Sequence, residues 1–179
     1  MVNTAVFSHS YCCKSRTDDC CPNLTTMSLE ATQLACKAFQ DFDAKVLVFP
    51  TAYQDRWIKE RDLKLSQAGK FGIDTGQLVF IGAVEQTFDE INGLADAVRD
   101  LRIARLIVVA EYWQMPTSLY LLKRKFPGLE VVPVRFTCSK FDEQDEPYAW
   151  KRYRSSRKWA WILTNLLRYA ASPLLARWL

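Results

Sequence analysis

The chain has a single histidine, His9, and only six glycines among its 179 residues. None of these glycines forms the Gly-x-Gly-x-x-Gly turn that lets a backbone approach a pyrophosphate, or a phosphate loop that ends in Gly-Lys-Ser/Thr. The sequence therefore argues against a standard NAD or ATP site. It also lacks any run of about 18 uncharged apolar residues, so we expect no ordinary membrane-spanning helix.

The N-terminal segment has no basic stretch followed by an apolar one, so we expect no cleaved signal peptide and a cytosolic protein with reduced thiols. Four of the six cysteines form two adjacent pairs, Cys12-Cys13 and Cys20-Cys21. Zinc ligands usually lie about two to four residues apart because they must converge on one tetrahedral ion, so we predict no zinc site. Incidental loop thiols and a redox role for the pairs both stay open.

Acidic residues are missing from the end of the chain. Residues 147–179 contain seven basic side chains and no Asp or Glu, whereas residues 1–146 contain 17 basic and 20 acidic ones. The formal charge of +4 is thus the sum of −3 for the body and +7 for the tail. We predict an α/β domain at 1–140, followed at 141–179 by an acidic break and a basic, aromatic helical tail.

Short, β-branched apolar runs alternate with amphipathic segments along the body. Because the runs are continuous, they indicate strands that are buried on both faces of a parallel sheet. Pro133 places the last of them at an edge. Strands are predicted at 5–7, 46–49, 78–81, 106–109 and 131–134, and helices at 28–40, 57–70, 88–98 and 116–126. With right-handed crossovers, this order gives an open, doubly wound and mostly parallel sheet of five strands in an α/β fold.

Ligands of such sheets bind beyond the carboxyl ends of the strands, where the strand order reverses. Polar residues follow the predicted strands at that edge, and we expect them to bind the ligand. They are Ser8, His9 and Ser10; Thr51 and Tyr53; Glu85, Thr87, Asp89 and Glu90; and Glu111, Tyr112 and Gln114. Glu111 follows a buried strand and faces the crevice, so we take Glu111 and Asp89 as the candidates for acid–base catalysis or metal positioning.

Several of these residues have a structural alternative. Thr87 and Glu90 have the spacing of a capping box, in which each side chain accepts from the other residue's backbone N–H. Asp89 can simply complement the positive helix N-terminus. His9 can be an ordinary loop residue, and Tyr112 can pack in the core instead of stacking on a ligand ring.

Two stretches of the chain resemble motifs of one family. Gln86-Thr87-Phe88-Asp89-Glu90 is similar to the Asn-Thr-aromatic-Glu-Asn motif that opens the helix after strand three in the DUF218 family, the YdcF/ElyC/SanA-like proteins. Val109-Ala110-Glu111-Tyr112-Trp113-Gln114-Met115-Pro116-Thr117 resembles their Val-Thr-Ser-x-aromatic-His-Met-x-Arg motif after strand four. The resemblance extends from the first strand to about Arg135.

This resemblance implies a Rossmann-like three-layer sandwich that binds a small polar ligand, nucleotide-like or an envelope precursor, at the sheet edge. It further implies a role in the cell envelope and, from one branch of the family, S-adenosylmethionine as a cofactor. An enzyme of this kind would be a transferase or hydrolase of a phosphorylated or activated metabolite.

The chain departs from the family pattern at the site itself. Gln114 stands where the family has His, and Thr117, which we include among the ligand-binding residues, stands where it has Arg. The family's glycines are replaced by Ser8-His9-Ser10 after strand one and by Pro50-Thr51-Ala52 after strand two. Gln114 can donate and accept hydrogen bonds but cannot shuttle a proton near neutral pH. Either the chain is a divergent member with other ligands, or the pocket has lost its activity.

The tail predicts a basic amphipathic helix from Trp159 onward, preceded by a basic cluster at 151–158. An apolar helix with tryptophans and adjacent basic residues suits an anionic membrane surface. The alternative is a terminal helix packed on the sheet with its arginines in solvent. The apolar stripe is Trp159, Ile162, Leu163, Leu166, Ala170 and Leu174, and Thr164, Asn165, Arg168 and Ser172 lie opposite.

The basic cluster is short and belongs to no known nucleic-acid-binding module, so we expect no nucleic-acid partner. The second function that the sequence supports is that of a non-catalytic, membrane-peripheral or scaffold protein with a vestigial pocket. In either function, the protein would be cytoplasmic or would lie at the inner face of the membrane.

Overall fold

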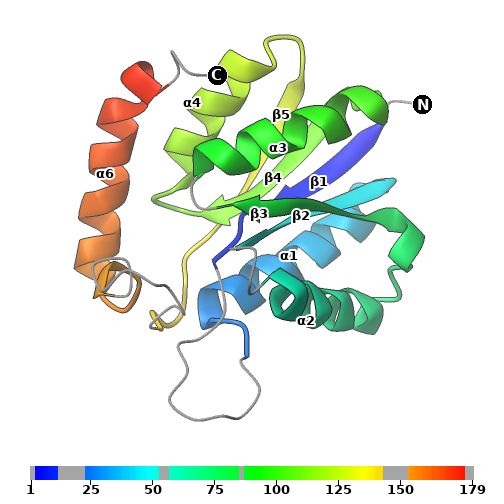
Figure 1. The fold of residues 1–179 in the computed structure, drawn as a ribbon, viewed down its shortest axis with the longest axis horizontal. Coiled ribbons are helices and arrows are strands. Elements are labelled where there is room, and N and C mark those ends of the chain that lie inside the picture. The colour runs from blue at the N-terminus through cyan, green and yellow to red at the C-terminus, as the bar shows by residue number, and fades with distance from the viewer. Residues whose placement is uncertain (1–2, 12–22, 53–56, 85–86, 143–152, 176–179) are drawn as a thin grey trace.

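A computed structural model of the chain describes residues 3–11, 23–52, 57–84, 87–142 and 153–175. Its centre is a sheet of five parallel strands in the order β3-β2-β1-β4-β5 (Figure 1). The strands are β1 (Thr4–Ser8), β2 (Val46–Ala52), β3 (Leu78–Val84), β4 (Arg105–Glu111) and β5 (Glu130–Phe136). The predicted α/β fold with a parallel five-stranded sheet is confirmed, and its three layers are those of a Rossmann-like sandwich.

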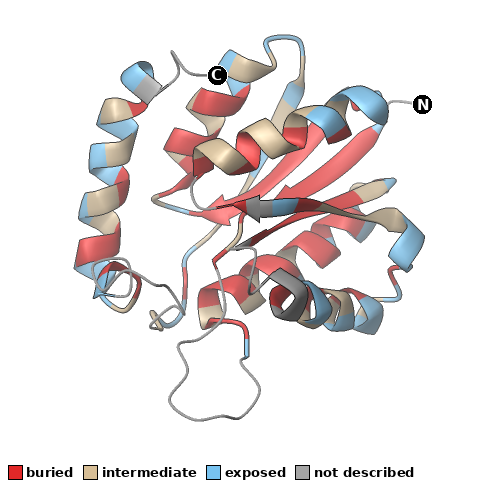
Figure 2. Ribbon diagram, viewed as in Figure 1, coloured by how far each residue is buried: buried red, intermediate tan, exposed pale blue. Residues whose placement is uncertain are grey.

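Helices cover both faces of the sheet, as the buried apolar runs predicted. They are α1 (Thr26–Asp41), α2 (Trp57–Lys70), α3 (Thr87–Asp100), α4 (Met115–Lys125) and α6 (Lys158–Leu175), with a short 3-10 helix, η1 (Thr75–Gln77), before β3. Alternate residues of β1 point to opposite sides: Phe7 packs in the core that α3 and α4 cover, and Val6 packs in the core that α1 and α2 cover. Figure 2 shows the resulting buried layer along β1 and β4.

The two strands at the margins of the sheet are β3 and β5. Strand β5 lies at one end of the strand order, which confirms the edge position predicted from Pro133. A proline suits an edge strand because it has no N–H to donate to a further strand. On the other margin, α3 approaches β3 closely at Gly93. A Cβ built there would lie 3.4 Å from the Cβ of Ile81, so a larger side chain at this position would be in direct contact with β3.

Helix α6 packs beside α4 rather than on the sheet (Figure 1). Its residue Trp161 is only 3% exposed and joins a buried cluster with Tyr11 and Cys138. The other buried residues of α6 are Ala160, Asn165 and Ser172, so the side that faces the body combines one tryptophan with small and polar residues and contains no leucine. Packing on the sheet, the alternative raised by the sequence, would have buried the apolar stripe. Helix α6 instead leaves most of this stripe exposed.

Three hydrogen bonds within α6 allow its polar side to be buried. Thr164 Oγ1 donates to the carbonyl of Ala160 at 2.7 Å, and Ser172 Oγ donates to the carbonyl of Arg168 at 2.9 Å. Asn165 Nδ2 donates to the carbonyl of Trp161 at 3.0 Å. Because each of these donors finds its acceptor one turn back, none of them needs a partner across the interface, whereas Asn165 Oδ1 is buried without a partner among the described residues. Among the described residues, no helix has the length and apolar character needed to cross a bilayer.

Candidate functional site

The carboxyl ends of β1 and β4 lie side by side at the point where the strand order reverses. Ser8 is in register with Val109, and the His9 N–H donates to the carbonyl of Val109 at 3.2 Å. The chain after β1 leads to α1 on one face of the sheet, whereas the chain after β4 leads directly to α4 on the other face. The sheet thus has a switch point between β1 and β4, and doubly wound sheets in general bind their ligands at such a point. That this chain binds a ligand there stays a prediction.

His9 is held by a carboxylate at this edge. The ring is 1% exposed, its Nδ1 bonds to Oε2 of Glu90 on α3, and Phe7 packs edge-on against it with ring centroids 4.9 Å apart. The other carboxylate oxygen, Glu90 Oε1, accepts from the N–H of Ser10 at 2.8 Å. The remaining ring nitrogen, His9 Nε2, is buried and has no hydrogen-bond partner among the described residues.

The capping box predicted for Thr87 and Glu90 needs correction. Helix α3 begins at Thr87, which therefore lies in the first turn and not at the cap. Both carboxylate oxygens of Glu90 bond to the chain that follows β1, at His9 and Ser10, so this side chain links β1 to α3. The capping-box spacing is local, whereas the actual partners are about 80 residues away in the chain.

Gln114 ties the start of α4 to the start of α3. Its Nε2 donates to Thr87 Oγ1 at 3.1 Å, which leaves Gln114 Oε1 buried without a partner among the described residues. Thr117, in the first turn of α4, is 2% exposed, and its Oγ1 likewise has no hydrogen-bond partner among the described residues. Contacts thus run from His9 through Glu90 and α3 to Gln114. His9 Nε2, Gln114 Oε1 and the nearby Thr117 Oγ1 are three buried polar atoms that lack a partner in the part of the chain that the structure describes.

Ser10 connects this edge to an ion pair that the sequence analysis missed. Its hydroxyl donates to Glu60 Oε1 at 2.6 Å, and Lys64 Nζ lies 2.7 Å from the same oxygen. Lys64 also donates to the carbonyl of Pro50 at 2.6 Å, and both charged side chains are 1% exposed. The spacing of four residues on a helix is a signal from which this ion pair could have been predicted. Nothing in this charged segment indicated that the pair is buried.

Glu111 lies on the other side of the sheet edge from His9. In β4 it alternates with Ala110 and so points, like Val109, toward the face that α1 covers, whereas His9 points toward α3. Glu111 Oε2 accepts from the Trp161 indole N–H at 2.9 Å and from the Trp113 N–H at 2.8 Å. Oε1 is buried without a partner among the described residues.

Burial raises the pKa of Glu111 above its ordinary value, and the hydrogen bond from Trp161 and those from backbone N–H groups oppose this rise. Tyr11 completes this side, because its hydroxyl accepts from the Glu111 N–H at 2.7 Å, and burial raises the pKa of Tyr11 well above its usual range. Sequence reasoning missed both Tyr11 and Trp161, which come from segments far from β4 in the chain.

The structure does not bring Asp89 and Glu111 into one pair. Asp89 is half-buried in the first turn of α3, and adjacent helical residues point in different directions, so Asp89 does not share the face that brings Glu90 to His9. Tyr112 is 47% exposed and stacks edge-on with Trp113 at 5.3 Å, so it does not pack in the core. The roles predicted for Asp89 and Glu111 stay predictions.

The other predicted residues have more limited contacts, or none that can be described. Ser8 is buried and its hydroxyl lies 3.4 Å from the carbonyl oxygen of His9. Thr51 at the end of β2 is buried, and its Oγ1 has no partner among the described residues. Tyr53 and Glu85 lie outside the described residues.

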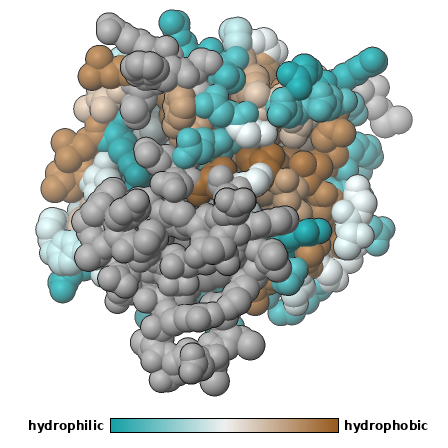
Figure 3. Space-filling model, viewed as in Figure 1, coloured by the Kyte–Doolittle hydropathy of each residue, from teal (hydrophilic) through white to brown (hydrophobic). Residues whose placement is uncertain are grey.

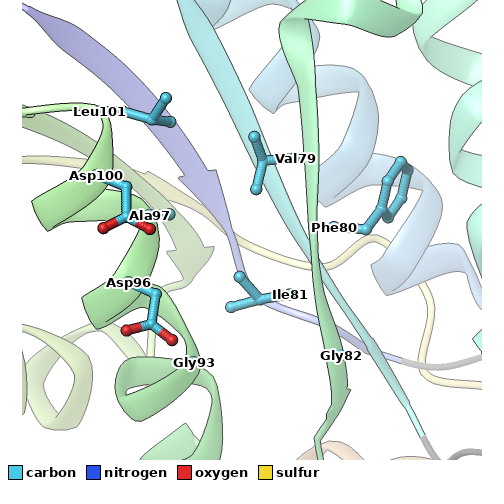
Figure 4. A pocket seen from close by; sticks show the side chains of 9 residues that line it. All are labelled: Val79, Phe80, Ile81, Gly82, Gly93, Asp96, Ala97, Asp100 and Leu101. Atoms are coloured by element: carbon cyan, nitrogen blue, oxygen red, sulfur yellow. The ribbon is translucent and has the colours of Figure 1, made fainter.

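A separate hollow of about 470 Å³ lies between β3 and α3 (Figure 4). Its floor is apolar, and Asp96 and Asp100 lie at its rim. Both aspartates pair with Arg99, so the rim is already neutralised in part. None of the predicted site residues lines this hollow, and no unpaired buried polar atom of the described residues faces it. The polar edge at β1 and β4 is therefore the stronger candidate.

The described residues contain no cluster of His, Cys, Asp and Glu arranged to hold a metal ion. The pairs Cys12-Cys13 and Cys20-Cys21 lie outside the described residues, so their role stays open. Cys36 and Cys138 are buried free thiols, and burial raises the pKa of each to about 12.

Comparisons with known proteins give no relative from which a function could be transferred. No family model, no curated protein and no solved structure matches the chain. The resemblance to the DUF218 family accordingly stays a prediction, and the fold and the polar edge must support any functional proposal.

Proposed function

We propose that the chain binds a small polar ligand against His9, Gln114 and Thr117 at the carboxyl edge of β1 and β4. The observation that supports this most is that three polar atoms on these buried side chains have no hydrogen-bond partner within the described part of the chain. A buried polar atom without a partner costs about 1–3 kcal/mol, so a folded chain retains several of them at one edge only at some expense in stability. A ligand that supplies the partners removes this cost.

The hydrogen bonds already made at this edge define what the ligand must offer. In the tautomer with Nδ1–H donating to the Glu90 carboxylate, His9 presents Nε2 as an acceptor. With its NH₂ group donating to Thr87, Gln114 presents Oε1 as an acceptor. Two acceptors on buried side chains at the same edge of the sheet favour a ligand rich in O–H or N–H donors, such as a sugar, another polyol or an amine.

The usual phosphate position of such folds is less suited to a ligand here. That position is the N-terminus of the helix after the first strand. In α1 the N–H of Thr26 donates to Asp142 Oδ2 at 2.8 Å, and the N–H of Ser28 donates to Thr25 Oγ1 at 3.0 Å. Protein oxygens thus already accept from these two N–H groups. If the ligand is nucleotide-like or an envelope precursor, this favours recognition of its hydroxyl groups over recognition of its phosphates.

The same geometry suits a transferase or hydrolase. A carboxylate that holds Nδ1–H fixes the tautomer in which Nε2 accepts a proton. A hydroxyl of the ligand, or a water molecule, that donates to Nε2 would pass its proton to this nitrogen while its oxygen forms a bond to the phosphoryl or acyl group of an activated metabolite, and the bond from that group to its leaving group breaks. This proposal assigns proton acceptance to His9. The two stretches that resemble DUF218 motifs contain Thr87, Glu90 and Gln114, although Gln114 departs from the family pattern. An envelope role and S-adenosylmethionine binding rest on the resemblance alone.

Thermal unfolding of the full chain with a panel of probes tests the proposal. The panel contains sugars, polyols, amines, nucleosides, S-adenosylmethionine, sugar phosphates and inorganic phosphate. We expect a donor-rich probe to raise the melting temperature by several degrees through mass action, and inorganic phosphate alone to leave it unchanged. A flat panel would reject the proposal and favour the non-catalytic protein with a vestigial pocket.

Thr117→Val sharpens the test because valine has the shape of threonine without the hydroxyl. Removing an unpaired buried oxygen should leave the free protein equally stable or about 1 kcal/mol more stable, while the shift caused by the bound probe decreases. Thr32→Val is the matched control, since Thr32 is equally buried but donates to the carbonyl of Ser28 at 2.7 Å. It should destabilise the protein and leave the probe's shift unchanged. The opposite pattern would contradict the assignment of Thr117.

A further inference from the structure

Helix α6 presents an apolar surface on the side that faces away from the body. This outer stripe consists of five side chains that recur at helical spacing and are each about half exposed or more. They are Trp159 (58%), Leu163 (50%), Leu166 (49%), Leu167 (62%) and Leu174 (61%). Figure 3 shows hydrophobic side chains along the flank of the molecule where α6 lies.

The orientation of α6 is the reverse of what its own sequence would favour in water. Burying apolar area stabilises a protein by about 25 cal/mol per Å², so an amphipathic helix that only had to cover the body would turn its leucines inward. Here the Trp161 N–H on Glu111 and the buried Asn165 and Ser172 set the inner side. The outer stripe is therefore left for an apolar phase outside the molecule.

The charges around the stripe identify that phase. Arg157 and Lys158 are exposed at the start of α6, and residues 147–179 contain no acidic side chain. Tyr153 (48% exposed) and Trp159 lie next to each other there, with ring centroids 6.0 Å apart, and the Arg157 guanidinium lies 4.9 Å from the centroid of the Tyr153 ring. Aromatic and basic side chains beside an apolar helical face match the depth profile of a lipid headgroup region.

We propose that the outer stripe docks on an anionic lipid surface, with α6 lying in the plane of the interface. A second copy of the chain fits less well, because pairing two outer stripes would bring two tails of +7 together without an acidic partner. Anionic lipids supply the opposite charge to the tail and the apolar phase to the leucines. The proposal does not depend on the ligand at the sheet edge.

Co-sedimentation with vesicles tests the docking of the full chain. One set of vesicles contains phosphatidylcholine alone, and the other contains phosphatidylcholine with phosphatidylserine. We expect clear binding to the anionic vesicles, much weaker binding to the neutral ones, and a loss of the difference at high salt because salt screens surface charges. A protein that stays in the supernatant with both vesicles overturns the proposal.

Point substitutions are preferable to removing the tail, because deletion would also take Trp161 out of a buried cluster. Leu163→Gln with Leu167→Gln should weaken binding at least ~tenfold, since both leucines would enter the lipid. Arg157→Gln with Lys158→Gln should weaken binding to anionic vesicles by about thirtyfold, at the usual contribution of a basic residue near such a surface.

Leu101→Gln is the matched control, since Leu101 is an exposed leucine beyond the end of α3, and this variant should bind as the parent chain does. Circular dichroism checks that each variant is folded. A leucine variant that binds vesicles like the parent overturns the proposal. So does light scattering that shows a lipid-free dimer which the leucine variant converts to a monomer, because the stripe would then belong to a second copy.

Discussion

Replacing Trp161 by phenylalanine removes one hydrogen-bond donor from the buried Glu111 and keeps most of the ring. The Trp161 ring packs edge-on against Tyr11 with centroids 6.0 Å apart and lies under the Arg154 guanidinium at 5.5 Å, and phenylalanine can keep much of both contacts. A hydrogen bond to a charged group contributes about 1.5–3 kcal/mol. Because Glu111 Oε1 has no partner among the described residues, we expect a loss of about 2 kcal/mol in the free energy of unfolding at pH values above the raised pKa of Glu111.

This loss should depend on pH in a direction that follows from the pKa of Glu111. Burial raises that pKa above its ordinary value of 4.5, so between 4.5 and the raised value the folded chain binds more protons than the unfolded chain. Stability therefore falls as the pH rises through this window and is constant above it. Trp161→Phe should raise the pKa of Glu111 further, because the lost hydrogen bond stabilises the ionised carboxylate more than the protonated carboxyl group. Below pH 4.5 the loss should decrease to about 0.5–1.5 kcal/mol, as for a neutral hydrogen bond.

Urea unfolding followed by far-ultraviolet circular dichroism at a series of pH values measures this effect. Trp159→Phe serves as the control because Trp159 is 58% exposed, and it should change stability by less than about 0.5 kcal/mol at every pH. In a Glu111→Gln background, Trp161→Phe should show only the smaller, pH-independent loss. A loss of equal size at all pH values in the parent background would refute the reasoning, since it would show that ring packing and not the bond to an ionised carboxylate holds Trp161.

Two further predictions concern other buried groups. Lys64→Met leaves the Glu60 carboxylate buried without its cation and should lower the free energy of unfolding by about 3–5 kcal/mol, measured by thermal unfolding. Combining Lys64→Met with Glu60→Gln should restore most of that loss, because no buried charge is then left alone. A double variant as unstable as the single one would contradict this prediction. Cys36 and Cys138 should stay unmodified by iodoacetamide in the native protein and react fully in urea, because burial raises the pKa of each thiol to about 12 and thiolate is scarce near neutral pH. Peptide mapping by mass spectrometry measures this, and rapid labelling of the native protein would be the contrary result.

The fold was predictable because each strand carries its own signal. The run 106–109 is continuously apolar, and β4, which extends from Arg105 to Glu111, has buried neighbours on both faces. Pro133 marked the sheet edge through the hydrogen bond that it cannot make. Local composition and backbone chemistry decide such features, so they can be read without knowledge of the rest of the chain.

The candidate site was predictable in outline, because topology alone brings the ends of neighbouring strands together. Its pairs were not. His9 meets Glu90, and Glu111 meets Trp161, across long stretches of sequence, and the spacing of Thr87 and Glu90 favoured a local capping box instead. Periodicity likewise separated the two sides of α6 but could not tell which side turns inward. That choice depends on the acceptor at Glu111, which α6 meets only in the folded chain.

The two sides of α6 have separate tasks, and this allows the two proposals to hold together. Trp161 and its buried neighbours fix the helix to the body beside Glu111, while the outer stripe shares none of these contacts. A lipid surface can therefore take up the outer stripe without drawing Trp161 away from Glu111, and the edge that carries His9 keeps its geometry while the protein is docked. It follows that the paired leucine substitutions in the outer stripe should weaken vesicle binding at least ~tenfold and leave the thermal shift with a donor-rich probe intact. Thr117→Val should instead decrease that shift and leave vesicle binding intact.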